Sequence, residues 1–402
     1  MYKLISSAVV LILIGACDDP LSPADSLRHQ FETAIPGTTI TVPAGIIEFK
    51  RSLILNVDGV TVRGAGMDKS ILTFKNQIAG AEGMLVNASD FTIEDLAIED
   101  SKGDALKINE GKNIIVRRVR TEWTNGPDVS NGSYGIYPVQ TENTLIEHSV
   151  AIAASDAGIY VGQSKNVVVR YSRAEYNVAG IEIENTIDAD VYENIAINNT
   201  GGILVFNMPD LPQEGHSTRV YNNQITNNNT ENFAPAGTAV SYVPAGSGVV
   251  INSNDKVEIF DNKIANNKTA NVLITSNFAS GYSADIESHA AFDPYPETIY
   301  IYNNQFAKGG NAPDIAELEQ LRVTMFGENG NLPDVLWDGF INPEKLTDGV
   351  IQSQSAICIP DEEVTLLDLD MDGEFANPSI DMSSHRCQHT NLDPVKLAPP
   401  LA

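Results

Sequence analysis

The chain has 402 residues, with 53 acidic and 25 basic side chains and a net charge of −28. This shortage of basic side chains excludes a sequence-independent nucleic-acid binder, because counterion release requires lysine and arginine. Hydrophobic residues make up 42% of the chain, enough for a sizeable core, while three cysteines exclude a disulfide scaffold and a multi-cysteine metal site.

The N-terminus has the layout of a secretory signal. Residues 1–17 combine one lysine, a short apolar run and small residues before a cysteine, and the run is too short for a stable membrane span. Ile14-Gly15-Ala16-Cys17 resembles the lipobox of bacterial lipoprotein signals. The resemblance implies that Cys17 is lipidated, that this lipid is the only membrane attachment, and that the protein is a periplasmic or outer-membrane lipoprotein of the cell envelope. The alternative is an ordinary signal in which Cys17 is incidental. Residues 18–28 predict a polar tether.

The middle of the chain contains a repeat. Short β-rich segments end at positions spaced 31, 23, 30, 23, 22, 29, 39 and 42 residues apart, so the period is 22–23 with insertions. The segments end at Arg63, Glu94, Arg117, Glu147, Arg170, Tyr192, Tyr221, Phe260 and Tyr302. Units this short cannot bury an apolar face alone and must stack.

Each unit carries a second β-rich stretch about seventeen residues later. Alternation predicts that one residue of each stretch points inward: Leu106, Ile136, Ile159, Ile181, Ile203, Val249 and Val272. The pattern resembles the right-handed parallel β-helix repeat family, the pectate-lyase-like superfold. The resemblance implies an all-β solenoid, which we place at residues 29–314.

Two sets of residues recur in register and predict ladders between coils. The column from Arg63 to Arg170 alternates in charge, and we expect it to be exposed. Asparagines recur just beyond it, where they suit left-handed turns and amide bonds to the next coil. They are Asn194, Asn223, Asn262 and Asn304, with Asn198, Asn199, Asn227, Asn228, Asn266 and Asn267.

Residues 315–402 break the repeat and predict a C-terminal cap or extension. Asp314 and Glu317 resemble a capping box before a short helix. If Cys17 is lipidated, Cys358 and Cys387 form an even pair in an oxidising compartment, where a disulfide is expected.

Insertions at residues 124–134, 207–217, 229–247 and 276–297 flank the second strand column and predict the walls of a groove. On its floor we place five catalytic candidates: Lys107, Tyr137, Tyr160, Glu182 and Glu184. Five further residues are candidates for substrate binding: Asn109, Trp123, Asp156, Phe206 and Asn252. Aromatic rings pack on the apolar faces of sugars while carboxylates bond to hydroxyls, so these residue types favour a polysaccharide.

Three mechanisms could use these residues. Lys107 or a tyrosinate could act as the base of a lyase or epimerase, or Glu182 and Glu184 could be the acid and base of a hydrolase. The Asp-Pro-His-Asp signature of alginate epimerases and the arginine base of pectate lyases are both missing, which leaves those activities without their usual residues. A solvated strand face without catalysis remains open.

The only cofactor that the sequence suggests is Ca²⁺. Glu182, Glu184 and Asp156 could hold it, and Asp368, Asp370 and Asp372 form a partial EF-hand-like loop with Ser379 at the twelfth position. We therefore expect a monomeric exported lipoprotein that binds a polysaccharide. Cleavage or epimerisation of that polysaccharide is one alternative, and binding without catalysis is the other. The alternative is a non-catalytic envelope scaffold or an accessory to a periplasmic metalloenzyme.

Overall fold

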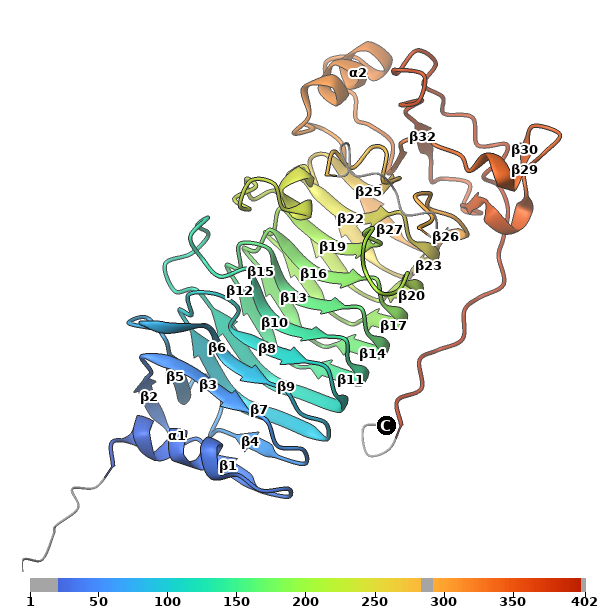
Figure 1. Cartoon of the computed structure of the whole chain (residues 1–402). Coiled ribbons are helices and arrows are strands. Elements are labelled where there is room, and N and C mark those ends of the chain that lie inside the picture. The colour runs from blue at the N-terminus through green and yellow to red at the C-terminus, as the bar shows by residue number, and fades with distance from the viewer. Residues whose placement is uncertain (1–20, 283–291, 399–402) are drawn as a thin grey trace, which may run out of the picture.

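A computed structural model describes residues 21–282 and 292–398, and in this part of the chain it is a right-handed parallel β-helix. Figure 1 shows short strands stacked coil on coil, with the chain rising from the N-terminal end to the C-terminal end. The predicted signal and Cys17 lie outside the described residues. No helix in the described ranges has the length and apolarity that a bilayer crossing requires.

Eleven strands form one parallel sheet, here called sheet B. Its strands are β3 (Arg51–Leu55), β6 (Ala79–Val86), β8 (Leu106–Asn109), β10 (Tyr134–Val139), β13 (Ala157–Gly162), β16 (Ala179–Glu184), β19 (Gly201–Phe206), β22 (Ser247–Asn252), β25 (Ala270–Thr275), β28 (Val335–Trp337) and β32 (Leu366–Asp368).

The other nineteen parallel strands form sheet A, which bends to cover two sides of the stack. Its first side contains β1 (Thr39–Thr41), β4 (Thr61–Arg63), β7 (Phe91–Glu99), β9 (Lys112–Glu122), β11 (Glu142–Glu147), β14 (Lys165–Arg170), β17 (Ile187–Tyr192), β20 (His216–Tyr221), β23 (Asp255–Phe260), β26 (Ile299–Tyr302) and β31 (Ile357–Cys358). Its second side contains β2 (Gly45–Glu48), β5 (Ser70–Thr73), β12 (Val150–Ile152), β15 (Arg173–Glu175), β18 (Ile195–Ile197), β21 (Gln224–Thr226), β24 (Lys263–Ala265) and β27 (Gln305–Ala307), and the long strands β7 and β9 belong to both sides.

The core lies inside the coil and follows the predicted alternation. The inward residues of sheet B pair in register from Leu106 through Ile136 and onward to Val272, and all of them are fully buried. Neighbouring coils are about 4.8 Å apart, so each inward side chain packs on its equivalent above and below. A single short repeat could not bury its apolar residues, but the stacked repeats bury them in one continuous column.

Asparagine ladders hold the two corners of sheet A, as predicted. The amides of Asn194, Asn223 and Asn262 each donate to the equivalent asparagine of the next coil, at 3.0–3.1 Å. At the second corner Asn199 and Asn228 do the same at 3.0–3.2 Å. The residues just before the second ladder, such as Asn198 and Asn227, have φ of 58°. Asparagine suits both positions because it tolerates the left-handed turn and supplies the amide.

The charged column of sheet A is also in register, but it is not exposed. Glu94 and Glu147 are only 6% and 5% exposed, because arginines of the neighbouring coils cover them. Arg170 donates to Glu147 at 2.8 Å and Arg63 to Glu94 at 2.6 Å. The expectation of a solvent-exposed column is therefore wrong for its glutamates.

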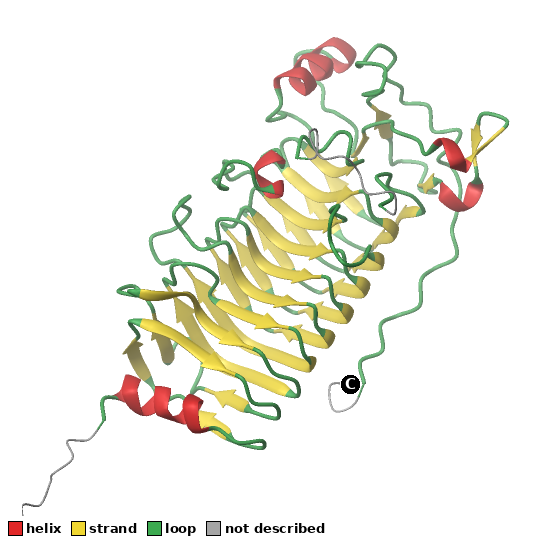
Figure 2. Cartoon of the chain, viewed as in Figure 1, coloured by secondary structure: helices red, strands yellow, loops and turns green. Residues whose placement is uncertain are grey.

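The folded part begins earlier than predicted. The helix α1 (Pro23–Thr33) includes most of the segment assigned to the tether, and its residues Leu27 and Phe31 are buried in the core. Ser22 caps it by accepting from the backbone N–H of Asp25 at 3.1 Å. Figure 2 shows this helix across the N-terminal end of the stack.

The C-terminal part is more than a cap. Strands β28, β31 and β32 extend both sheets beyond residue 314, and β29 (Leu346–Thr347) and β30 (Val350–Ile351) form a small hairpin. The predicted helix is α2 (Ala316–Phe326), but Ile315 rather than Asp314 is its N-cap, and no side chain caps it. The Asp314 carboxylate instead accepts from the backbone N–H of Ala245. Cys358 and Cys387 are joined by a disulfide.

Candidate functional site

The outward face of sheet B carries the residues that the sequence singled out. Tyr137 is in register with Lys107 one coil away, and Tyr160 with Glu182. Glu184, two residues after Glu182, is in register with Phe206 of the next coil. Because the strands are adjacent and parallel, the five catalytic candidates lie on four neighbouring strands.

A third tyrosine joins them that sequence reasoning missed. The ring of Tyr134 lies 4.4 Å from that of Tyr137 and 4.6 Å from that of Tyr160, measured between centroids. Strict alternation would place Tyr134 inward, but Gly135 and Ile136 both face the interior. A Cβ at Gly135 would lie 2.6 Å from the buried hydroxyl of Thr121, so glycine permits this break in the alternation. The glycine that precedes five of the seven inward residues was the available signal.

Carboxyl groups interleave with these rings. The Tyr160 hydroxyl donates to Glu184 Oε1 at 2.6 Å, and the Tyr134 side chain lies close enough to Asp156 to affect its pKa. Glu182 is 1% exposed, and its Oε2 is buried without a hydrogen-bond partner. We call the whole set the tyrosine–carboxyl cluster; its members are Asp104, Tyr134, Tyr137, Asp156, Tyr160, Glu182 and Glu184.

Burial raises the pKa of every acid in the cluster. Burial, reinforced by the charge of Glu184, raises the pKa of Asp156 to about 8. Burial likewise raises the pKa of Glu182 and of Glu184, and it raises that of Asp104 to about 6. Lys107 is the cation beside this group, with its ammonium 4.8 Å from the centre of the Tyr137 ring. The cluster therefore holds neutral, proton-donating carboxyls next to one that is largely ionised at neutral pH.

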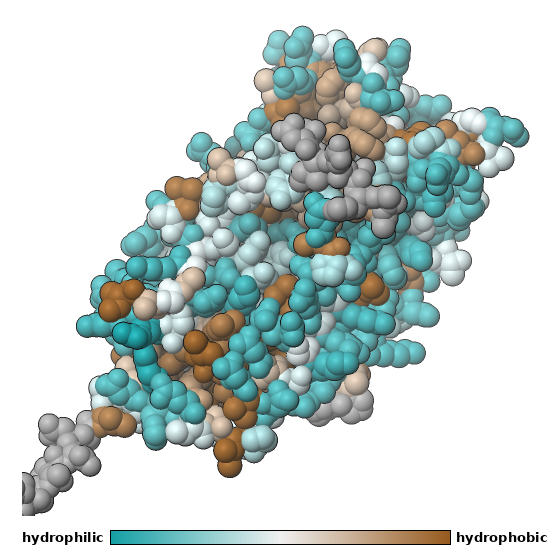
Figure 3. Space-filling model, in the orientation of Figure 1, coloured by the Kyte–Doolittle hydropathy of each residue, from teal (hydrophilic) through white to brown (hydrophobic). Residues whose placement is uncertain are grey.

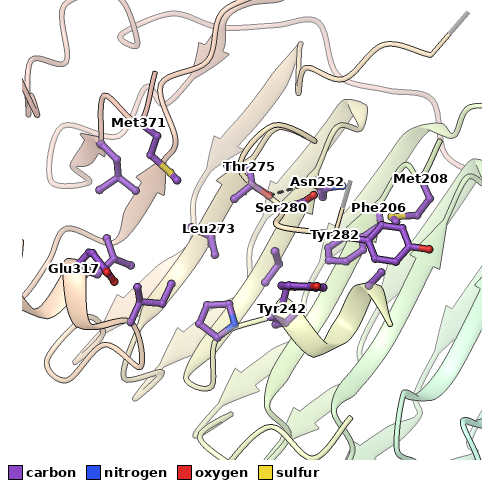
Figure 4. Close-up of a pocket in the computed structure, with 18 of the residues that line it drawn as sticks. Phe206, Met208, Tyr242, Asn252, Leu273, Thr275, Ser280, Tyr282, Glu317 and Met371 are labelled. Atoms are coloured by element: carbon purple, nitrogen blue, oxygen red, sulfur yellow. Dashed lines mark hydrogen bonds between the residues drawn. The ribbon is translucent and has the colours of Figure 1, made fainter. Parts of the chain in front are cut away.

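An apolar pocket of about 390 Å³ lies on the same face, over the later strands β19, β22 and β25. Figure 4 shows Phe206, Tyr242, Tyr282 and Leu273 around it, with Glu317 of α2 at one side. Because Phe206 is in register with Glu184, the pocket begins one coil beyond the tyrosine–carboxyl cluster. Figure 3 shows that polar side chains otherwise cover most of the visible face.

The residues predicted to bind substrate lie in four different places. Phe206 and Asn252 line the pocket, and Asp156 belongs to the tyrosine–carboxyl cluster. Asn109 lies beside Asn87 at the N-terminal end of the face. Trp123 is 4% exposed in the core and donates to the carbonyl of Ser101 at 2.8 Å, so it offers no surface to a sugar. The neighbouring insertion suggested that Trp123 would be exposed. The chain instead enters the coil at this residue, which buries the ring.

The EF-hand-like loop uses its carboxylates locally. Asp368 Oδ1 accepts from the backbone N–H of Asp370, and Asp370 Oδ2 accepts from that of Asn377. Ser379 pairs with Asp368 through a backbone bridge instead of facing a common centre. Asp372 is exposed. Among the described residues these three carboxyls do not form a convergent group that could hold a metal ion, so the structure gives the assignment of this loop to Ca²⁺ no support.

The chain belongs to a known family. The model of the right-handed β-helix region family matches residues 44–210 and 128–306, which together span more than half of the chain. A search of curated proteins gives no match.

Among solved structures, the chain is similar to the A-module of mannuronan C-5 epimerase AlgE4 from Azotobacter vinelandii. The identity is 19% and the TM-score 0.51, over 72% of this chain and 88% of that one. The AlgE6 A-module from the same organism has 17% identity and a TM-score of 0.49, over 79% and 84%. The catalytic unit of an α-1,3-glucanase from Streptomyces thermodiastaticus has 14% identity and a TM-score of 0.46, over 79% and 47%. At these identities the similarity shows the fold alone.

Proposed function

We propose that the protein binds a polysaccharide along the outward face of sheet B and acts on it by acid–base chemistry at the tyrosine–carboxyl cluster. The observation that carries the proposal is the clustering of protonated carboxyls and tyrosines on one face of a rigid sheet, next to an aromatic-lined pocket. Carboxyls with divergent pKa values are what acid–base catalysis on glycans requires.

Partial exposure distinguishes the reacting groups from those that support them. Glu184 and Asp104 are partly exposed, whereas Asp156 and Glu182 are buried. Glu184, whose pKa is raised by burial and whose carboxylate accepts from the Tyr160 hydroxyl, is the proposed proton donor to the glycosidic oxygen. Asp104, with a pKa of about 6, precedes β8, three strands from β16, and is too far from Glu184 to act as base on the same bond. Asp156 and Glu182 are positioning residues.

Charge favours a neutral glycan as substrate. The chain carries −28, and the cluster has one neighbouring lysine, so a polyuronate would meet repulsion along its whole length. Tyr134 and Tyr137 are partly exposed and offer ring faces or edges to the apolar sides of sugar rings, whereas Tyr160 and Phe206, 3% and 5% exposed, pack beneath the surface.

The non-catalytic alternative fits the structure less well. A surface for a protein partner would leave the apolar floor residues of the later coils exposed. Leu204, Val250 and Leu273 are instead 0%, 3% and 7% exposed, under the segments that build the pocket. This burial favours a shaped small-molecule or glycan site.

We further propose that the protein is an exported lipoprotein, a monomer attached to the envelope through Cys17. The support is the sequence of residues 1–17 alone. Mass spectrometry of the protein purified from a bacterial membrane fraction tests it, because a Cys17→Ser variant would lose the lipid mass.

The test of the activity is a panel of neutral glucans and fructans, with alginate and pectin as charged comparisons. Released reducing ends report hydrolysis, and absorbance at about 230 nm reports the unsaturated uronides of β-elimination. We expect product from a neutral glycan that is lost in Glu184→Gln and retained in Glu142→Gln, an exposed acid on sheet A. Binding without product would reduce the proposal to a lectin-like role, and the absence of both would overturn it.

A further inference from the structure

A second group of carboxylates lies away from the tyrosine–carboxyl cluster, at the corner where sheet B passes into sheet A. It consists of Asp255, the first residue of β23, with Asp293 and Glu297 from the segment that precedes β26. One carboxylate oxygen from each of the three lies within 4.8 Å of the other two. Among the described residues, this is the group whose acidic side chains converge so closely.

Backbone hydrogen bonds set the orientation of these side chains. Asp255 Oδ1 accepts from the N–H of Glu297 at 2.9 Å, and Asp293 Oδ1 accepts from the N–H of Tyr295 at 3.1 Å. The N–H of Asp293 donates in turn to Glu214 Oε1 at 2.6 Å, which brings a fourth carboxylate alongside. Asp293 Oδ2 accepts only a long hydrogen bond from the Asn342 amide, at 3.5 Å. The orientation of Asp255 and Asp293 is therefore set by the fold.

Glu297 provides an independent observation that points to a ligand. Its side chain is 6% exposed, and Oε1 is buried without a hydrogen-bond partner. Oε2 faces the ammonium of Lys345 at 3.4 Å, longer than a normal charge-assisted hydrogen bond. A buried carboxylate oxygen with no partner is costly, so a native structure rarely keeps one without a reason.

The local charge is not balanced by protein groups. Asp255, Asp293 and Glu297 all interact with the ammonium of Lys345, and Glu214 lies beside Asp293. The like charges of these carboxylates repel one another. A divalent cation would relieve this repulsion and supply the partner that Glu297 Oε1 lacks.

We propose that Asp255, Asp293 and Glu297 bind a Ca²⁺ ion. All the donors are hard oxygens, which Ca²⁺ and Mg²⁺ prefer over nitrogen or sulfur. Ca²⁺ accepts six to eight oxygens in flexible geometry, whereas Mg²⁺ demands near-ideal octahedral geometry and keeps its waters, so a cluster of carboxylates favours Ca²⁺. The ion would tie the segment before β26 to coil β23, beside Glu214 of the loop after β19 and the 3₁₀ turn Pro343–Lys345.

The test is calorimetric titration of the purified protein, stripped with EDTA, with CaCl₂ and separately with MgCl₂. We expect one Ca²⁺ per chain, weaker Mg²⁺ binding, and a higher Tm in CaCl₂. Asp293→Asn and Glu297→Gln should each weaken Ca²⁺ binding at least about tenfold, because ligand charge sets affinity in such sites. Asp293 is partly exposed, so its variant tests the site even if Glu297→Gln folds poorly.

Two further variants separate the site from general charge effects. Asp68→Asn removes one exposed carboxylate far from the site and should leave the affinity unchanged. Lys345→Gln removes the competing ammonium and should bind Ca²⁺ as tightly as the native protein, or more so. The proposal is overturned if the native protein shows no saturable Ca²⁺ binding, or if Asp293→Asn and Glu297→Gln fold and bind as it does. Loss of binding in Asp370→Asn alone would also overturn it.

Discussion

The outward faces of the two large sheets carry acids in opposite circumstances. On sheet A, Glu147 is buried between Arg117 and Arg170, and these hydrogen bonds outweigh the effect of burial, so that its pKa is lowered. On sheet B, Asp156 is equally buried but its partner is Tyr134, and its pKa rises to about 8. Acidic residues therefore form ion pairs that stabilise the stack on sheet A, where their neighbours are arginines. On sheet B, where the neighbours are tyrosines, they retain their protons.

The largest expected effect concerns catalysis on sheet B. Replacing Glu184 by Gln removes the proposed proton donor and should lower kcat by about 10²–10⁴-fold. Steady-state kinetics on the glycan identified by the screen measure it. Glu147→Gln makes the same chemical change on sheet A and should leave kcat unaltered; a comparable loss there would show that the effect is structural.

The next effect concerns stability on sheet A. Glu147→Gln should lower the free energy of unfolding by about 2 kcal/mol, because it breaks buried ion pairs whose arginines are only partly exposed. Urea denaturation measures this loss. Glu182→Gln on sheet B should cost nothing at pH 8, since it replaces a carboxyl that has no cationic partner. Equal losses of unfolding free energy in the two variants would refute the contrast between the acids of sheet A and those of sheet B.

The third prediction is a pH dependence. Because the pKa of Asp156 is raised from 3.8 to about 8, the folded state retains a proton that the unfolded state releases. Its contribution to stability is complete below about pH 4 and is lost as the pH rises through about 8. Native protein should therefore lose at least about 1.4 kcal/mol more than Asp156→Asn over this range, the equivalent of one pK unit. Parallel stability curves would contradict the raised pKa.

The smallest expected effect concerns the C-terminal segment, which runs back along sheet A (Figure 1). Backbone N–H groups of Leu392 and Val395 donate to Glu258 and Asp190, at 2.9 and 3.2 Å. Deleting residues 390–402 removes these donors from buried carboxylates and should cost about 1 kcal/mol. Thermal unfolding measures the change, and Lys396→Ala, which keeps the backbone, serves as the control. An unchanged Tm would mean that the segment does not stabilise the stack.

Periodicity predicted the coils well because equivalent residues, stacked in register, occupy the same environment in every coil. The inward column from Leu106 to Val272 and the asparagine ladders follow from position within the repeat alone. Prediction failed where the repeat is interrupted. Strand β28 follows an insertion longer than one coil, so the continuation of sheet B beyond residue 314 carried no periodic signal.

The candidate site was predictable only in part, for a related reason. Lys107, Tyr137, Tyr160, Glu182 and Glu184 are outward by alternation, and their spacing predicted that they would be neighbours. Tyr134 was missed because Gly135 breaks the alternation, and Trp123 was misjudged because exposure at an insertion depends on how the chain enters the coil.

The sequence by itself determined the parallel β-helix, its register and the identity of most residues on the face of sheet B, since these depend on local period and side-chain alternation. The tertiary structure alone decided which acids are paired and which are protonated, and it alone brought Asp255 to Asp293 and Glu297. Those outcomes depend on burial and on distances between segments up to 42 residues apart. Burial and distance are set by packing across coils, which no local pattern encodes.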